Sequence, residues 1–204
     1  MSIEKAMNKI LCGVTIVTTK YYDKVEKFVI DAFQKTGQEN QIVHFKRTVY
    51  WVKKLNPKAD EALLISSIAH DIERGFRSKE TLEKHKKGGY TDNNFLRSHE
   101  EKGAEIIAEF LRKQGADKKL IDRVKMLISR HEEGGNEDQN LLKDADSVSF
   151  FENNLSIFFR KAEIEGKDKI KRKFNWMYNR ITSVKAKQYA KRDYEKALKE
   201  LDKV

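Results

Sequence analysis

Apolar side chains recur every three or four positions along most of this chain, which is the spacing of amphipathic helices rather than of strands. One proline and ten glycines in 204 residues also leave few places for tight turns. The pattern predicts an all-α protein, a helical bundle without a substantial sheet. The expected helices cover about residues 20–36 and 41–55, a segment from Pro57 to Gly75, about residues 99–114, a segment from Asp117 to Gly134, and about residues 141–164.

Three helix boundaries are predicted from residues with special backbone roles. Pro57 has no N–H group to lose, so it can occupy the first position of the third helix. Ser98 and Glu101 have the spacing of a capping box, which predicts that the next helix begins at His99. Asp117 is expected to cap the helix that follows it.

Two stretches do not follow the helical pattern. Residues 76–97 are polar and are predicted to form a long loop with one short helix over about 79–86. So long a connection in a helical domain often covers a site. The β-branched run 14–19 is the strand candidate of the sequence, and it has no evident partner strand.

The positive charge is concentrated near the C-terminus. The formal net charge is +10, and residues 160–204 hold 15 Lys and Arg against 7 Asp and Glu. Apolar residues three to five positions apart in the same stretch predict an amphipathic helix or helix pair. We therefore expect a helical domain over residues 1–165, with a basic helical extension over 166–204 packed on it. The basic face is either ordinary solvated surface or a surface that attracts phosphate-rich ligands or nucleic acid, although no nucleic-acid-binding motif accompanies it.

A lone cysteine, Cys12, restricts both the compartment and the ligand chemistry. It has no partner for an internal disulfide or a thiolate metal site, which indicates a reducing compartment, and we expect a cytoplasmic protein. No run approaches the roughly 18 apolar residues that would span a bilayer, so no membrane association is expected. Any metal must be held by histidine and carboxylate.

Four of the five histidines are expected to face the protein interior, the exception being His85 in the polar loop. Polar side chains that face a core need partners, because burying them unpaired costs several kcal/mol each. Imidazoles and carboxylates that arrive from several helices would satisfy one another around a cation. The inward-facing residues are His44, His70, His99 and His131, together with Asp71 and Asp146.

In this arrangement the chain resembles the HD-domain superfamily of metal-dependent phosphohydrolases over about residues 40–155. The family pattern is a His on one helix, a His-Asp pair that ends a hydrophobic helix, and a later Asp. Two more histidines characterise the subgroup that adds a second metal. The matches are His44 in HFKRTVYWVKKL, His70 and Asp71 in ADEALLISSIAHDIE, Asp146 in LLKDADSVSFFE, His99 in RSHEEKGAEIIAEFL, and His131 in VKMLISRHEEG.

The resemblance implies a centre with one or two divalent ions, which could be Mn, Fe, Co, Ni, Zn or Mg because mixed N/O ligands select weakly among them. It implies that His70 and Asp71 are catalytic. Asp144 lies two residues before Asp146 and is the alternative final ligand, but the family places that ligand in the Asp preceded by Ala. The implied metal ligands are His44, His70, Asp71, His99, His131 and Asp146.

The implied activity is hydrolysis of a phosphoester in a nucleotide or another small phosphorylated compound, with metal-activated water. Two other functions stay open. One is an HD-type di-iron oxygenase, which uses the same six ligands for O₂ chemistry. The other is a non-catalytic nucleic-acid-binding module with a structural metal. The candidates for neutralising substrate phosphate, with plain surface charge as the alternative, are Arg74, Arg77, Lys102 and Arg130.

Overall fold

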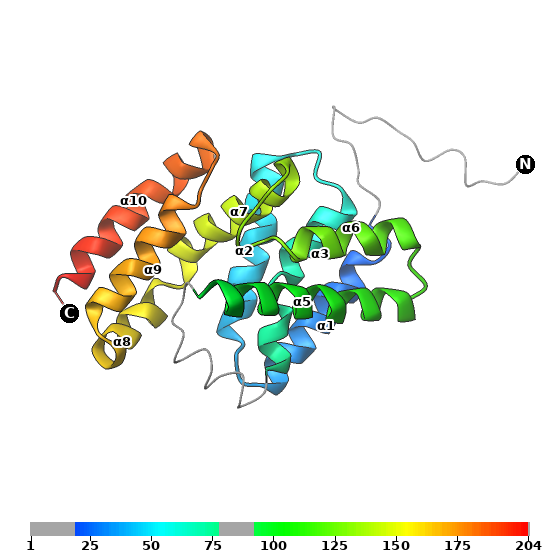
Figure 1. The fold of residues 1–204 in the computed structure, drawn as a ribbon, viewed down its shortest axis with the longest axis horizontal. Coiled ribbons are helices and arrows are strands. Elements are labelled where there is room, and N and C mark those ends of the chain that lie inside the picture. Colours follow the sequence, from blue (N-terminus) through cyan, green and yellow to red (C-terminus); the bar gives the residue numbers. More distant parts are fainter. Residues whose placement is uncertain (1–18, 78–91, 204) are drawn as a thin grey trace, which may run out of the picture.

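A computed structural model describes residues 19–77 and 92–203 as an assembly of helices, shown in Figure 1. Within these ranges there are nine α-helices, one 3₁₀-helix and no strand, so the expected all-α class is confirmed there. The short helix expected over 79–86, His85 and residues 14–18 of the strand candidate lie outside the described residues. The elements are α1 (Tyr22–Lys35), α2 (Asn40–Leu55), α3 (Glu61–Ala69), η2 (Ile72–Phe76), α5 (Asn93–Lys113), α6 (Lys118–Ile128), α7 (Glu137–Asn153), α8 (Leu155–Glu165), α9 (Lys167–Asn179) and α10 (Val184–Leu201).

The prediction that Pro57 begins the third helix is wrong. Helix α3 begins at Glu61, because the Asp60 carboxylate accepts a hydrogen bond from the Leu63 N–H at 2.9 Å and caps the helix there. The α-helix also ends earlier than expected, at Ala69, and the chain continues as the 3₁₀-helix η2. This early end determines how the chain presents the next two side chains to the site.

The capping box predicted at Ser98 is also wrong. Asp92 caps α5 by accepting from the Phe95 N–H at 2.8 Å, so Ser98 lies inside the helix rather than before it. Asp117 does cap α6, as predicted, by accepting from the Leu120 N–H at 2.8 Å.

The helix expected over 141–164 is two helices, α7 and α8. Helix α7 begins earlier than predicted because Asn136 and Gln139 form a reciprocal capping box. The helix is interrupted at Asn154, which separates α7 from α8. Helix α6 ends at Ile128, well before Gly134, and the intervening residues form turns that lead into α7.

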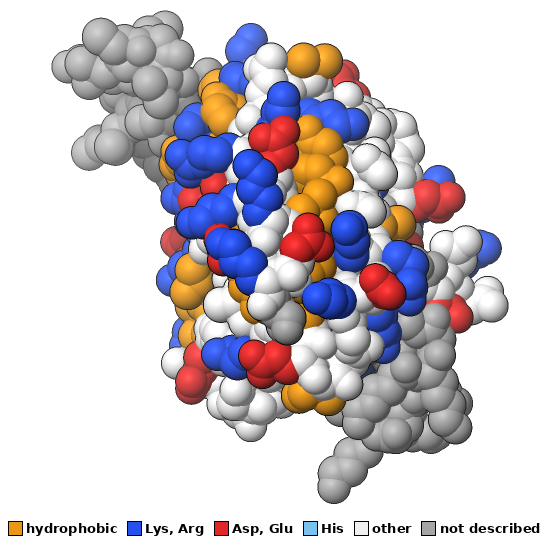
Figure 2. Space-filling view, turned by 90° about the vertical axis from the view of Figure 1, so that its left-hand side faces the viewer, with side chains coloured by type: hydrophobic (Ala, Val, Ile, Leu, Met, Phe, Trp, Pro, Cys, Tyr) orange, Lys and Arg blue, Asp and Glu red, His pale blue; other side chains and the backbone are white. Residues whose placement is uncertain are grey.

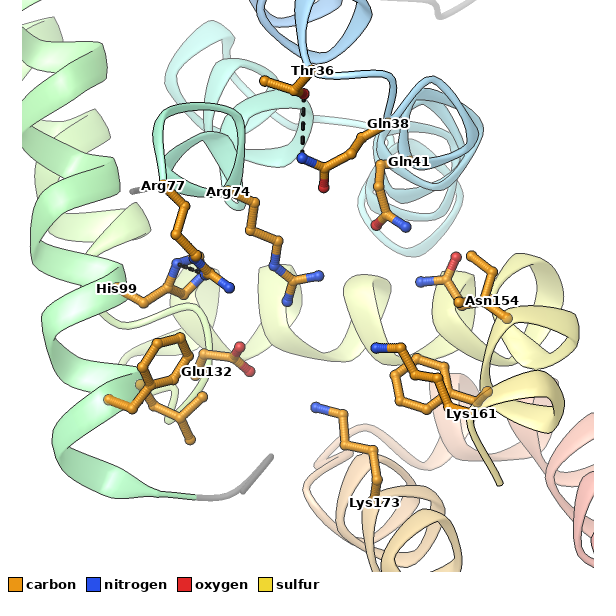
Figure 3. Close-up of a pocket in the computed structure, with 14 residues that line it drawn as sticks. Thr36, Gln38, Gln41, Arg74, Arg77, His99, Glu132, Asn154, Lys161 and Lys173 are labelled. Atoms are coloured by element: carbon orange, nitrogen blue, oxygen red, sulfur yellow. Dashed lines mark hydrogen bonds between the residues drawn. The ribbon is translucent and has the colours of Figure 1, made fainter. Parts of the chain in front are cut away.

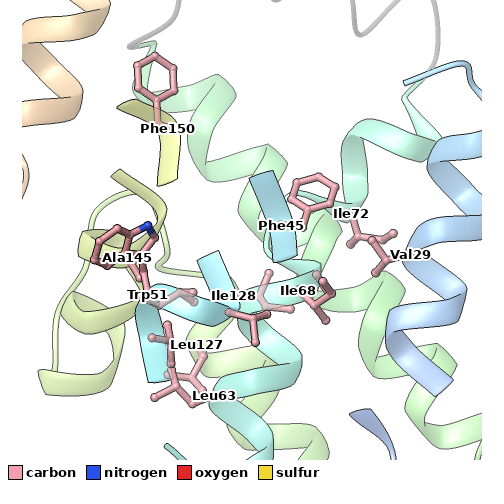
Figure 4. Packing of buried hydrophobic residues seen from close by; sticks show 14 of the residues in the cluster. Val29, Phe45, Trp51, Leu63, Ile68, Ile72, Leu127, Ile128, Ala145 and Phe150 are labelled. Atoms are coloured by element: carbon pink, nitrogen blue, oxygen red, sulfur yellow. The ribbon is translucent and has the colours of Figure 1, made fainter. Parts of the chain in front are cut away.

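The core is centred on α3, whose residues Ala62–Ala69 are all buried between α1, α2 and α6. Figure 4 shows how side chains from different helices meet there, among them Phe45 of α2, Ile68 of α3 and Ile128 of α6. All three are fully buried. Helix α2 also packs along α7, and α5 packs along α6.

Residues 166–204 contribute to the same core. Helices α9 and α10 pack on each other, and α10 packs against α7 (Figure 1). Ile170 and Phe174 of α9 are fully buried, and the Phe174 ring lies 6.3 Å from the Phe151 ring of α7. On the side of the molecule seen in Figure 2, basic side chains are interleaved with acidic ones. Lys169 of α9 and Glu165 of α8 form one ion pair between neighbouring helices. Among the described helices, none combines the length and apolar character needed to cross a bilayer.

Candidate metal centre

Seven buried side chains that could ligate a metal converge where α2, α3, α5, the α6–α7 connection and α7 meet. They form two groups, and within each group the potential ligand atoms lie within 4.8 Å of one another. All six ligands implied by the family resemblance belong to these groups, and Glu132 is an addition. The first group is His44, His70 and Asp146, and the second group is Asp71, His99, His131 and Glu132.

The first group is arranged around one carboxylate oxygen. Asp146 Oδ1 lies 3.0 Å from His44 Nε2 and 3.4 Å from His70 Nε2. The two imidazole rings meet edge to face, with centroids 5.5 Å apart. Three helix segments therefore direct one oxygen and two nitrogens at a common point.

Asp71 joins the second group to the first. Its Oδ1 lies 2.8 Å from His99 Nε2 and 3.7 Å from His131 Nε2. Its Oδ2 lies 3.7 Å from His70 Nε2, on the side of the first group. Glu132 Oε1 approaches the same His131 nitrogen at 3.8 Å. Asp71 thus has the position of a bridging carboxylate between two neighbouring sites.

Backbone carbonyls fix the proton position on two of the histidines. His70 Nδ1 lies 2.9 Å from the Ser67 carbonyl oxygen, and His131 Nδ1 lies 2.8 Å from that of Ile128. A carbonyl can only accept a hydrogen bond, so each Nδ1 carries the hydrogen and donates it. In the neutral ring, Nε2 then holds a lone pair that faces the carboxylates.

Side chains hold the other two histidines in the same way. The Ser149 hydroxyl donates to the His44 carbonyl at 2.8 Å, so its oxygen accepts from His44 Nδ1 at 2.9 Å. The Glu73 carboxylate accepts from His99 Nδ1 at 2.8 Å. Burial opposes the charge on Glu73, but hydrogen bonds from His99 and Arg77 lower its pKa to about 2. An outer acceptor for Nδ1–H is the usual support of a metal-ligating histidine.

The donor set fits a divalent cation. In the described part of the chain, Nε2 of His70 and Nε2 of His131 are buried and have no hydrogen-bond partner. Their nearest neighbours across the centre are oxygens of Asp146, Asp71 and Glu132, at 3.4 to 3.8 Å. Lone pairs that face ionised oxygens across such gaps need a cation between them, and mixed imidazole and carboxylate ligands suit Mn, Fe, Co, Ni and Zn.

The carboxylates of the centre are ionised at neutral pH. Burial opposes their charge, but Arg74 and His70 hold the pKa of Asp71 well below its usual range. Arg180 and His44 do the same for Asp146. The negative charge acts back on His70, where Asp71 and Asp146 outweigh burial and raise the imidazole pKa to about 8. A proton on His70 would therefore balance part of this charge when no metal is bound.

Arg180, which follows α9, is a member of the site that sequence reasoning missed. Its guanidinium pairs with Glu132 Oε2 and with Asp146 Oδ2, and its Nε donates to the Ser147 hydroxyl at 2.8 Å. Arg180 therefore holds one carboxylate oxygen in each group, from Asp146 and from Glu132. The other oxygens, Asp146 Oδ1 and Glu132 Oε1, face the histidines. No pattern in the sequence distinguishes Arg180, because it is one of many basic residues in the stretch expected to be a basic helical extension.

The structure separates Asp144 from Asp146. Asp144 points away from the histidines and accepts hydrogen bonds from the backbone N–H groups of Thr182 and Ser183, at 2.9 and 2.7 Å. It therefore anchors the connection between α9 and α10. Asp146 lies in the first group, at the position that the resemblance implies for the final ligand.

A cavity of about 420 Å³ opens beside the second group and is shown in Figure 3. Its lining includes His99, Glu132, Arg74 and Arg77. Two of the four candidates for neutralising phosphate, Arg74 and Arg77, therefore face this cavity. Arg74 Nη1 lies 3.0 Å from Asp71 Oδ2, and Arg77 pairs with Glu73 at 2.5 Å.

Lys102 and Arg130, the other two candidates, are not among the described residues that line this cavity. Lys102 is exposed on α5. The next residue, Gly103, faces the His70 carbonyl and Ile128, and adjacent positions of a helix point about 100° apart. Arg130 is exposed and bonds to the Gly134 carbonyl at 3.1 Å.

Fold and site together define an all-α protein with a buried histidine and carboxylate centre that could hold metal ions. A family model described as "Domain of unknown function (DUF4202)" matches residues 25–201, and the chain belongs to this family. The match runs through α9 and α10, so the family unit includes the helices that carry Lys173 and Arg180. Comparison with curated proteins and with solved structures gave no match.

Proposed function

We propose that this protein is an HD-type metal-dependent phosphohydrolase that cleaves a phosphoester of a small molecule. The observation that carries the proposal is the common orientation of four buried histidines. Each donates Nδ1–H to an outer acceptor and directs Nε2 at carboxylate oxygens beside a positively lined cavity. These histidines are His44, His70, His99 and His131.

A divalent ion bound here would polarise a phosphoryl oxygen and lower the pKa of a bound water toward neutrality. The residues of the chain supply the rest. Asp71 is placed to ligate and to accept a proton from an attacking water, because Arg74 and the histidines keep it ionised. Arg74 and Arg77 face the cavity and would neutralise the phosphate as its charge shifts toward the leaving oxygen.

The test combines elemental analysis with an activity panel. Protein purified without chelator is analysed for metal identity and count, then assayed for phosphate release from a panel of phosphoesters with that metal. We expect up to two ions per chain and turnover of at least one phosphoester. Asp71→Asn should lower the activity at least 100-fold, because it removes the charge of the bridging carboxylate. Glu163→Gln, an exposed position on α8, is the matched control.

Other outcomes would redirect the proposal. A requirement for iron together with O₂ consumption would indicate a di-iron oxygenase. Salt-sensitive nucleic-acid binding that persists in Asp71→Asn, without phosphatase activity, would indicate a non-catalytic module. Absence of bound metal under every loading condition would refute a metal-dependent hydrolase.

A further inference from the structure

The cavity beside the metal centre has a second basic end, away from the metal ligands. Figure 3 shows Lys161 and Lys173 on the opposite side of the cavity from His99 and Arg77, with Arg74 between. Lys161 comes from α8 and Lys173 from α9. The two lysines therefore form a separate group that a phosphate bound at the metal ligands would leave unused.

Lys173 is placed as an anion-binding group. Its side chain is only 7% exposed, and within the described residues its Nζ forms no ion pair within 4 Å. The Trp176 ring centroid lies 4.2 Å from this Nζ. Burial lowers the Lys173 pKa to about 8. Attraction to Glu132 opposes this effect, and repulsion from Arg180 and Arg74 adds to it. A buried ammonium in such surroundings would be stabilised by an anion from a ligand.

The two arginines at the metal end already have carboxylate partners, unlike Lys173. Arg74 pairs with Asp71 and Arg77 with Glu73. Burial lowers the pKa of Lys161, and repulsion from Arg74 lowers it further. Lys161 is therefore close enough to Arg74 to share its positive surroundings. The cavity thus combines a metal end with paired arginines and a distal end with two lysines.

The cavity wall also offers hydrogen-bond acceptors, on the side of Lys161 in Figure 3. Gln41 Oε1 and Asn154 Oδ1 are buried, line the cavity, and have no hydrogen-bond partner among the described residues. Hydroxyl or amino groups of a ligand would satisfy them. The volume of about 420 Å³ lies within the roughly 300–1,000 Å³ range of small-molecule sites.

We propose that this cavity binds a hydroxyl-bearing small molecule with two phosphate groups, one at the metal centre and the other held by Lys161 and Lys173. The inference rests on the proposed function and names its substrate class. A sugar bisphosphate and a nucleoside bisphosphate share this chemistry. In the reaction, water attacks phosphorus at the metal end and the P–O ester bond breaks. The water oxygen remains on inorganic phosphate, and one water proton passes to the released alcohol, which keeps its distal phosphate.

The test uses matched pairs of ligands that differ by one phosphate. The pairs are fructose 1,6-bisphosphate with fructose 6-phosphate, and adenosine 3′,5′-bisphosphate with adenosine 5′-monophosphate. Binding to the full-length protein is measured by calorimetry, both metal-free and metal-loaded, followed by phosphate release. We expect one bisphosphate to bind at least about tenfold more tightly than its monophosphate, because a charge-assisted contact contributes roughly 1.5–3 kcal/mol. The pair that responds identifies the sugar or the nucleoside source.

Three variants locate the second phosphate. Lys161→Met and Lys173→Met should each remove most of the preference for the bisphosphate and change monophosphate binding less than about threefold. Lys167→Met, at an exposed position of α9, should behave as the wild type. Because Lys161 is on a different helix from Lys173, its variant remains informative if Lys173→Met unfolds, which circular dichroism would reveal.

The outcomes separate this inference from the proposed function. Equal affinity for both members of every pair, or equal losses for both in the lysine variants, would overturn the bisphosphate inference. Lysine-dependent binding of a bisphosphate without phosphate release under any metal would support the ligand class and overturn the hydrolase.

Discussion

At the scale of single residues, the centre depends on where protons and charges are held. The four histidines donate Nδ1–H to three kinds of acceptor: a hydroxyl, a carboxylate and, for two of them, a backbone carbonyl. The rings cannot rotate without losing these bonds, so Nε2 stays directed at the carboxylates. The orientation that metal binding requires is therefore built into the folded chain.

Asp144 and Asp146 differ in role although they are two residues apart. Asp146→Asn should lower the number of bound ions, because it removes an ionised oxygen from the first group. Asp144→Asn should leave the metal count unchanged and lower the free energy of unfolding by about 1 kcal/mol, because Asp144 anchors the backbone at Thr182 and Ser183. Elemental analysis and urea unfolding of both variants check this. The opposite pattern would make Asp144 the ligand.

Arg180 should act on metal affinity through Asp146 and Glu132. A lysine cannot bond both carboxylates with one planar fork, so Arg180→Lys should weaken metal binding about 10–100-fold while the fold is kept. Arg192→Lys is the matched control, because the Arg192 side chain is 89% exposed. Competition with a chromophoric chelator measures both variants. Unchanged affinity in Arg180→Lys would show that the ligands hold their positions without it.

Six of the seven candidate ligands that the structure brings together were predictable from the sequence, because each interrupts an apolar pattern or ends an apolar helix. Glu132, Lys173 and Arg180 could not be found in this way. Their types are ordinary in charged segments. Glu132 is buried because of the turns between α6 and α7, and Lys173 and Arg180 are buried because α9 packs on the rest of the molecule. Conversely, Lys102 and Arg130 are near the ligands in sequence, but they are exposed.

At the scale of elements, the ends of helices explain how neighbouring residues join the same centre. In an α-helix, adjacent side chains diverge by about 100°. The pairs His70–Asp71 and His131–Glu132 follow the last residues of α3 and α6, where the chain leaves helical geometry. The predicted helix continued to Gly134, and in such a helix Glu132 would point about 100° away from His131. The earlier end of α6 at Ile128 allows both side chains to join the centre. Helix positions were largely predictable from periodicity, whereas the ends depended on caps such as Asp60, Asp92 and Asn136.

Gly103 of α5 lies where this helix passes closest to α6 and to the end of α3. A Cβ at this position would lie 3.5 Å from the His70 carbonyl oxygen and 3.6 Å from Ile128, which is ordinary contact. Gly103→Ala should therefore stabilise the protein by about 0.5–1 kcal/mol, because glycine is costly inside a helix. Gly103→Leu should destabilise it by more than about 1 kcal/mol, because the larger side chain must separate α5 from α6 and the end of α3. Thermal and urea unfolding measure both variants, and destabilisation by alanine would contradict the expected tolerance.

At the scale of the whole molecule, residues 166–204 and the body share one core and one site. Phe174 packs near Phe151, and Arg180 reaches the ligands. The sequence analysis predicts a basic helical extension packed on the domain, and the structure adds that Arg180, between α9 and α10, belongs to the candidate site. The boundary expected at residue 165 falls between α8 and α9, which pack against each other.

Cooperative unfolding follows from this shared core and can be read from two tryptophans. Trp51 lies on α2 and Trp176 on α9, and the chain has no others. In Trp51→Phe and in Trp176→Phe, the fluorescence and far-ultraviolet circular dichroism transitions in urea should coincide within each variant. Transitions that separate in either variant would show that the C-terminal helices unfold independently.

Arg180 lies later in the chain than all the candidate ligands, so it is synthesised after them. Synthesis proceeds from the N-terminus, so the seven ligands, from His44 to Asp146, are made before Arg180 exists. Until α9 docks, the carboxylates of Asp146 and Glu132 lack the guanidinium that holds them in the finished protein. A chain that still lacks α9 would therefore present a more open and more negative cluster of carboxylates than the completed molecule does.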